Sequence, residues 1–184
     1  MPYIELHASS AFSFLRGGSS PEHLAETAAK LKMPALALLD RNGVYGSQRF
    51  SAACREQNVR PIVGCELAME DGCMLPVLVE DRIGYKNLCE LLTQAHLRSE
   101  KGSCVICYSE LAAFSAGLVA LFGNPSAKRA QFLNETFGRE NVYIEIQRHL
   151  IRGEEQINRQ LIDLADSYHL PLLATNGVRY ATAH

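Results

Sequence analysis

The residues best suited to chemistry in this sequence stand at or just beyond the ends of short apolar runs. The run 35–39 ends at Asp40, and His7, Glu66 and His149 each close another run. Imidazole and carboxylate groups hold zinc, manganese or iron in hydrolases, where the metal activates water. Each such residue alone is more often a hydrogen-bonded or ion-paired structural group. Their joint position predicts a metal site, with His7, Glu66 and His149 as ligands and Asp40 as a fourth.

Four arginines fall in the same strand-end loops: Arg16, Arg41, Arg148 and Arg179. Arginine stays protonated and cannot bind a metal. Several guanidinium groups near one site would oppose a divalent cation, and would instead pair with Asp40 and Glu66 or bind phosphate. A scatter of ordinary surface arginines is an equal alternative.

The elements that must position these residues are short strands alternating with helices. Apolar runs predict strands at residues 3–7, 35–39, 60–65, 75–79, 118–122, 142–146 and 171–175. These runs are rich in Val, Ile and Leu, which is typical of buried parallel strands. Helices are predicted to begin at Ser20-Pro21, where a capping hydroxyl precedes proline, and to cover the segments from Gly84 and over 157–168.

About seven strands separated by helices favour an α/β fold with a parallel sheet, either a barrel or an open doubly wound sheet. The polar residues favour the barrel, because there the carboxyl ends of all strands converge on one mouth, whereas an open sheet gathers only those near its switch point. The residues concerned are His7, Asp40, Glu66, Asn124, His149 and Asn176.

Composition and charge narrow the class of protein. With 184 residues, 47% of them hydrophobic, the chain is expected to form a single domain over 1–184. A net charge of -2 gives no basic footprint for nucleic acid at the level of the whole chain. No apolar run approaches bilayer length and no signal peptide is evident, so we expect a cytoplasmic protein. The chain stops directly after the last predicted strand, which predicts a fragment of something longer.

The six cysteines are interpreted as thiols outside any site. Cys104 and Cys107 form a C-x-x-C, but no second ligand pair stands at zinc-site spacing. In a cytosolic chain, unpaired thiols are the simpler interpretation, and a metal or redox site is the alternative.

Several separated stretches resemble one family. They are "ELHASSAFSFLRGGSSPEHL", "MPALALLDRNGVYGSQRF", "RPIVGCEL", "GYKNLCELLTQAH" and "LPLLATNGVRYA". They are similar to the N-terminal PHP domain (polymerase and histidinol phosphatase) of bacterial C-family DNA polymerases, most nearly those of the error-prone type. The resemblance runs from Met1 to about Thr182. It implies a distorted (β/α)7 TIM-like barrel. In active members a metal cluster at the barrel mouth hydrolyses phosphoesters, and in some replicative polymerases it is linked to 3′–5′ proofreading.

The family pattern can be laid on this chain one position at a time. The H-x-H motif reads His7-Ala8-Ser9, the D-H motif reads Asp40-Arg41, and the N-D-x-H-Y motif reads Asn176-Gly177-Val178-Arg179-Tyr180. An aspartate before glycine is replaced by Arg16, and a histidine before the fourth strand by Met74. By resemblance, the surviving ligands are His7, Glu66 and His149, and the replaced positions are Ser9, Arg16, Arg41, Met74, Gly177 and Arg179.

The pattern therefore predicts a degenerate metal site that holds no metal or other cofactor. The resemblance implies an inactive, structural domain that supports the core of an error-prone DNA-directed DNA polymerase, a nucleotidyltransferase of DNA repair or translesion synthesis. Its partners would be the rest of that chain and, through the whole enzyme, DNA, but no membrane. One alternative is a residual phosphoesterase or 3′–5′ exonuclease with zinc or manganese at His7, Glu66 and His149. Another is phosphate or DNA-backbone binding by Arg16, Arg41 and Arg179.

Overall fold

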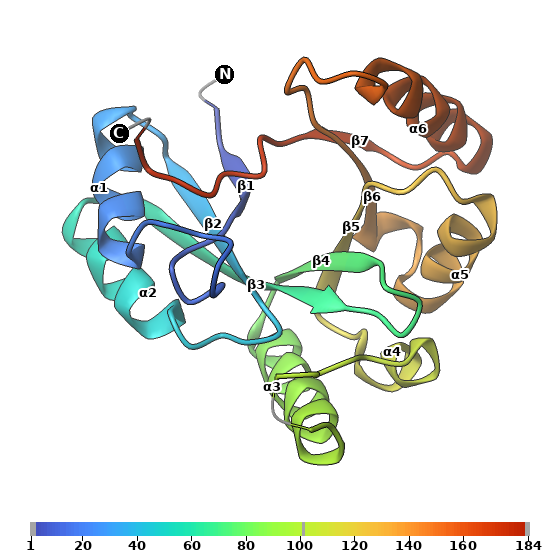
Figure 1. Cartoon of the computed structure of the whole chain (residues 1–184), viewed down its shortest axis with the longest axis horizontal. Helices are drawn as coiled ribbons and strands as arrows, with labels where there is room; N and C mark the ends of the chain where they lie inside the picture. The colour runs from blue at the N-terminus through green and yellow to red at the C-terminus, as the bar shows by residue number, and fades with distance from the viewer. Residues whose placement is uncertain (1–2, 101, 183–184) are drawn as a thin grey trace. The chain divides into compact units, whose positions relative to one another are not determined.

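The computed structural model describes residues 3–100 and 102–182 (Figure 1). In this part of the chain, strands alternate with helices along the sequence. The strands are β1 (Glu5–Ala8), β2 (Ala35–Arg41), β3 (Arg60–Ala68), β4 (Met74–Val79), β5 (Leu118–Phe122), β6 (Val142–Ile146) and β7 (Leu172–Ala174). The helices are α1 (Pro21–Lys30), α2 (Ser47–Glu56), α3 (Arg82–Arg98), α4 (Tyr108–Phe114), α5 (Ala127–Phe137), the short 3-10 helix η1 (Arg139–Asn141) and α6 (Glu154–Tyr168).

The seven strands form one mixed sheet whose spatial order follows the chain, β1 to β7. The predicted α/β fold with seven strands and intervening helices is therefore confirmed. The expectation of an all-parallel sheet is wrong at β4, which runs antiparallel to β5. The cause is the short connection between β3 and β4, which turns at Gly72 with φ +80°. A parallel pair needs a crossover of about a dozen residues or more, so a connection this short reverses the strand direction.

By its internal contacts the chain divides into two compact units, Met1–Glu66 with Gly177–His184, and Leu67–Asn176. The first unit holds β1, β2, most of β3, α1 and α2, and the second holds β4 to β7 with α3 to α6. The single domain over residues 1–184 stays a prediction.

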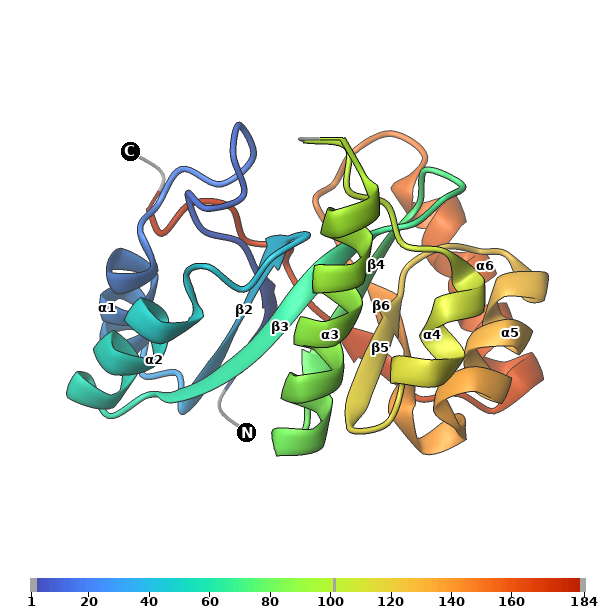
Figure 2. The ribbon, with the colours of Figure 1, turned by 90° about the horizontal axis from the view of Figure 1, so that it is seen from below.

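Helix α1 shows why the first unit folds as it does. Ser20 caps the helix, its hydroxyl accepting from the N–H of His23, and Pro21 takes the first helical position, as the sequence predicts. The buried face of α1 carries Leu24, Ala25 and Ala28, which belong to one apolar cluster with residues of β2 and α2. Figure 2 shows α1 and α2 lying together beside β2. Burying a leucine side chain contributes about 1.5–3 kcal/mol, so this packing fixes β2 and the residues at its end.

The second unit has its own core around β5 and β6. Four of its residues are completely buried: Leu88 and Leu91 of α3, Leu121 of β5 and Ile144 of β6. Helix α3 starts at the cap Asp81, whose carboxylate accepts from the N–H of Gly84 at 2.8 Å. A Cβ at Gly84 would lie 1.8 Å from the carbonyl oxygen of Gly117, so only glycine permits this close approach. In the described residues, no helix has both the length and the apolar character that crossing a membrane requires.

Candidate functional site

Glu66 is the first predicted ligand whose surroundings the structure reveals. It pairs in register with Arg41 across β2 and β3. Its Oε1 lies 3.4 Å from Nε2 of His7, and its Oε2 lies 3.9 Å from a guanidinium nitrogen of Arg16. The side chains of His7 and Glu66 are only 10% and 17% exposed. The structure thus brings His7, Glu66 and Arg16 together in the first unit, and Arg16 pairs with Glu66 as predicted.

The carboxylate of Asp40 was predicted to pair with arginines, but in the structure it accepts hydrogen bonds from serines. Its Oδ1 accepts from the N–H of Ser10 at 2.8 Å and from the hydroxyl of Ser13 at 2.7 Å. Its Oδ2 accepts from the hydroxyl of Ser10 at 2.8 Å. Asp40 is 2% exposed, whereas Arg41 is exposed. Successive side chains of a strand point to opposite faces, which directs the Arg41 guanidinium away from its neighbour's carboxylate.

Most positions where the family pattern is replaced also gather in the first unit. Residues after β7 run beside β1: the N–H of Ser9 donates to the carbonyl of Val178 at 2.8 Å, and the N–H of Val178 donates to the carbonyl of His7 at 2.9 Å. The N–H of Gly18 donates to the carbonyl of Arg179 at 2.9 Å, so Arg179 and the loop of Arg16 are neighbours. The members of this group are Ser9, Arg16, Arg41, Gly177 and Arg179.

His149 and Met74 belong to the second unit, where Met74 opens β4. The Nδ1 of His149 lies 3.1 Å from Oε1 of Glu154, and its Nε2 lies 2.8 Å from the carbonyl oxygen of Asn176. Both ring nitrogens therefore lie within hydrogen-bonding distance of an oxygen atom. The pKa of Glu154 is lowered: loss of hydration acts to raise it, but hydrogen bonds from the backbone N–H and ring of His149 outweigh that effect. These contacts hold His149 against the start of α6.

With this geometry in hand, comparison with known proteins gives the family. The family model described as "PHP domain" matches residues 5–149. This protein belongs to the PHP domain family. The predicted family is therefore confirmed, together with the fold type that the resemblance implied.

The PHP domain is similar in sequence to error-prone DNA polymerases. That of Anaeromyxobacter sp. (strain K) is 35% identical over 190 residues, which covers 96% of this chain and 17% of the relative. That of Pseudomonas fluorescens is 36% identical over 180 residues, covering 96% of this chain and 17% of the relative. The chain therefore spans only about a sixth of the length of these curated relatives.

Solved structures with the same fold include proteins of other kinds. An amidohydrolase from Chromobacterium violaceum, with bound sulfate and no metal, has a TM-score of 0.70 at 14% identity, covering 96% of this chain and 87% of that one. A putative metal-dependent phosphoesterase from Bifidobacterium adolescentis has a TM-score of 0.65 at 16% identity, with the same two coverages of 96% and 87%. At such low identity these likenesses establish the fold alone.

Two carboxylates of the PHP domain are buried at positions that the sequence did not predict. Glu5 in β1 is 1% exposed and accepts from the hydroxyl of Tyr3 at 2.6 Å and from the N–H of His7 at 2.8 Å. Burial and the hydrogen bond to Glu5 raise the pKa of Tyr3. Glu145 in β6 is 5% exposed and accepts from the hydroxyl of Thr175 at 2.6 Å. Glu5 is the first residue of β1 and Glu145 lies within β6, and the alternation of a strand does not show which carboxylates find hydrogen-bond donors.

The cysteines of the PHP domain are all outside disulfides, as predicted. The N–H of Ile106 donates to the carbonyl of Ala68 at 2.8 Å, so the segment between Cys104 and Cys107 pairs beside the end of β3 and is used structurally. Within residues 3–100 and 102–182, no group of three or more His, Cys, Asp or Glu side chains is arranged to hold a metal ion.

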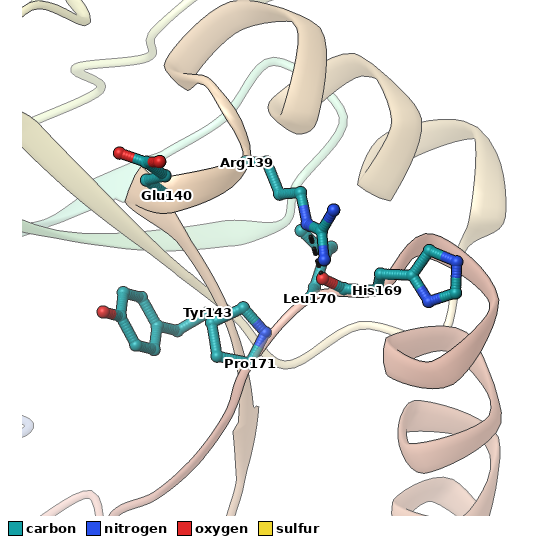
Figure 3. Close-up of a pocket in the computed structure, with 6 residues that line it drawn as sticks. All are labelled: Arg139, Glu140, Tyr143, His169, Leu170 and Pro171. Carbon is teal, nitrogen blue, oxygen red and sulfur yellow. Dashed lines mark hydrogen bonds between the residues drawn. The ribbon is translucent and has the colours of Figure 1, made fainter.

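A shallow groove lies elsewhere in the second unit (Figure 3). It is lined by Arg139, Glu140, Tyr143, His169, Leu170 and Pro171. The Nε of Arg139 donates to the carbonyl of His169 at 2.9 Å, which ties η1 to the end of α6. These residues precede or open β6 and β7, so the groove is at the amino ends of those strands. Active sites of related α/β folds lie at the carboxyl ends, and none of the predicted site residues lines this groove.

Proposed function

We propose that this chain is the N-terminal PHP domain of an error-prone DNA polymerase, with a degenerate metal site and a structural role. The domain does no chemistry of its own and supports the polymerase core in DNA repair or translesion synthesis. The proposal is supported by relatives of that name at 35% identity over 96% of the chain, of which the chain spans only 17%. A domain of that relative size would act as one part of a much longer protein.

The proposal rests on the partners of Asp40 and Glu66, the two strand-end carboxylates of the first unit. Glu66 faces His7 and the guanidinium of Arg16. Asp40 accepts three hydrogen bonds from Ser10 and Ser13. A divalent ion would have to break those hydrogen bonds and share Glu66 with an arginine that cannot lose its proton. The donors of this unit therefore fit a metal poorly.

A metal titration of the full-length polymerase tests the inactive role. The protein is purified without added metal, analysed for its metal content and titrated with manganese or zinc. Hydrolysis of a phosphoester and of a 3′-labelled DNA strand is measured at each step. We expect less than one metal per chain and no metal-dependent hydrolysis. Tight, stoichiometric binding with turnover that is abolished by His149→Ala would overturn the proposal.

A variant with the five replaced positions of the first unit restored to the family pattern provides the matched control for that titration. It carries Ser9→His, Arg16→Asp, Arg41→His, Gly177→Asp and Arg179→His. We expect this variant to bind manganese or zinc more tightly than the parent, because new ligands replace the cations that oppose the metal. Equal, weak binding by both proteins would show that the replaced residues are not what disables the site.

The competing function is a residual metal-dependent phosphoesterase or 3′–5′ exonuclease. One observation favours it: His7 and Glu66 still lie 3.4 Å apart, close enough to bind one ion together. A structural neighbour is also described as a putative metal-dependent phosphoesterase. In this case His7→Ala should lower metal affinity, with no effect expected under the structural role.

Anion binding is a third candidate, because Arg41 and Arg179 have exposed side chains in the first unit. A neighbour of the same fold is described with bound sulfate and no metal. If these arginines hold phosphate or the DNA backbone, affinity falls steeply with salt and Arg41→Ala reduces the slope of that dependence by about one. Binding that does not change with salt argues against this function.

A further inference from the structure

The loop that follows β1 combines a closed, braced base with an apolar tip. Gly17 lies so close to Ser10 that a Cβ on it would be 2.1 Å from the Ser10 carbonyl oxygen. The N–H groups of Arg16 and Gly17 donate to the carbonyl of Ser13 at 2.9 and 3.0 Å. Ser10 and Ser13 in turn donate to the buried carboxylate of Asp40. The loop therefore holds one shape, although it projects from the first unit (Figure 2).

The tip of this loop exposes two consecutive large apolar side chains. Phe14 is 83% exposed and Leu15 is 89% exposed. Leu15 also has φ +60°, a left-handed conformation that leucine rarely adopts. Such backbone outliers persist only where surrounding contacts impose them, and they cluster at functional sites. Apolar side chains on a preorganised loop are typical anchors of a protein interface, because such a loop loses little conformational entropy on binding.

We propose that Phe14 and Leu15 dock into an apolar pocket on the polymerase portion of the same chain. This inference rests on the proposed function, in which most of the chain lies beyond this domain, since the curated relatives are about six times as long. A tethered partner is present at high effective concentration, so an anchor of two side chains is sufficient. Arg16 and Arg41 flank the loop as partly or fully exposed cations, which indicates an acidic rim around the pocket.

In this arrangement Asp40 stabilises the shape of the loop that carries Phe14 and Leu15. By the family resemblance it stands where active members carry the aspartate of a metal-binding motif. Here its oxygens fix the two serines that shape the loop. The carboxylate positions a docking element in place of a cation.

Hydroxyl-radical footprinting of the full-length polymerase tests the docking. The matched comparison is Leu15 with Leu97 of α3, because the two leucines are 89% and 83% exposed. Leu31, which is 62% exposed at the end of α1, is the second reference. We expect Leu15 to be oxidised at least fivefold more slowly than Leu97. Oxidation of Leu15 as fast as that of Leu97 overturns the docking.

A double variant, Phe14→Ser with Leu15→Ser, gives the second readout. It should expose the junction after this domain to protease and split the thermal transition of the whole polymerase, whereas Leu31→Ser should do neither. Protection of Leu15 that disappears when the protein is diluted to a monomer overturns the proposal in favour of a second copy of the chain.

The metal titration keeps the two proposals apart. A loop that is exposed in a chain without metal refutes docking alone. A chain that binds metal and hydrolyses phosphoesters refutes the proposed function, whatever the footprint shows.

Discussion

The two compact units each contain a histidine paired with a glutamate, and the pairs differ in nearly every physical respect. His7 and Glu66 come from β1 and β3 and are 10% and 17% exposed. His149 and Glu154 are five residues apart at the start of α6, where the histidine is 44% exposed and the glutamate 11% exposed. Charges interact more strongly where water is excluded. The first pair ties distant strands together, while the second shapes one helix start.

This difference shows that a chain can keep a residue of the ligand type without keeping the metal site to which that residue belonged. His7 and His149 match the same family pattern, yet one faces a carboxylate shared with Arg16 and the other has both ring nitrogens at acceptors. Each histidine is already satisfied by its own unit. We therefore expect substitutions to cost the most stability where both partners of a pair are buried, with little effect on metal binding.

The largest effect should come from Asp40→Ala. Removing this carboxylate leaves the N–H of Ser10 and the hydroxyls of Ser10 and Ser13 without their acceptor. Unsatisfied buried donors cost about 1–3 kcal/mol each, so we expect a loss of about 3 kcal/mol or more in unfolding free energy. Urea unfolding followed by circular dichroism measures it. Asp40→Asn, which keeps the size and one acceptor, should lose about half as much, and a loss below about 1 kcal/mol for Asp40→Ala contradicts the bracing role.

Glu66→Gln and Glu154→Gln make a matched pair that tests the contrast directly. Glu66→Gln removes the charge that faces His7 and Arg16 in a mostly buried setting. We expect it to lose about 1–2 kcal/mol, as is typical of charge-assisted hydrogen bonds. Glu154→Gln should cost less, because Glu154, although only 11% exposed, pairs with a histidine that is 44% exposed, and ion pairs with an exposed partner contribute little. The same urea experiment measures both losses of unfolding free energy, and equal losses would contradict the difference between the two pairs.

The sequence predicted the seven strands and the helices α1, α3 and α6 close to where they lie, whereas α2, α4 and α5 had no predicted range. The predicted strands at 118–122 and 142–146 are β5 and β6 to the residue. A serine before proline located the start of α1 because a cap and a fixed φ are local effects. The direction of β4 was missed, since it depends on which strands pair across the β3–β4 turn and not on the residues of β4.

The partners of the site residues were less predictable than their positions. The pairing of Arg16 with Glu66 could be expected from charge. The serines around Asp40 could not, because Ser10 and Ser13 carry no charge and reach it only through the shape of one loop. Burial of Glu5 inside β1 was equally hidden, since the alternation of a strand does not reveal which carboxylates find donors.

The smallest expected effect is a pH dependence confined to the second unit. The pKa of Glu154 is lowered from its ordinary value of 4.5. A lowered folded pKa stabilises the folded state above the unfolded value, and this contribution is lost as the pH falls below about 4.5 through the folded pKa. Carbon-detected NMR titration of the Glu154 carboxyl measures it, and His149→Ala should move the pKa back toward 4.5 by removing the ring's hydrogen bond.

Glu22 of the first unit serves as the internal control in the same titration. A hydrogen bond from Arg49 lowers its pKa from the same ordinary value of 4.5, and this pair makes no use of His149. In His149→Ala the pKa of Glu22 should therefore stay where it is while that of Glu154 rises. If both values move together, the substitution has disturbed the whole fold, and the histidine has a wider role than starting α6. If neither moves, the backbone hydrogen bonds to Glu154 from His149, Leu150 and Ile151 account for the lowered pKa without the ring.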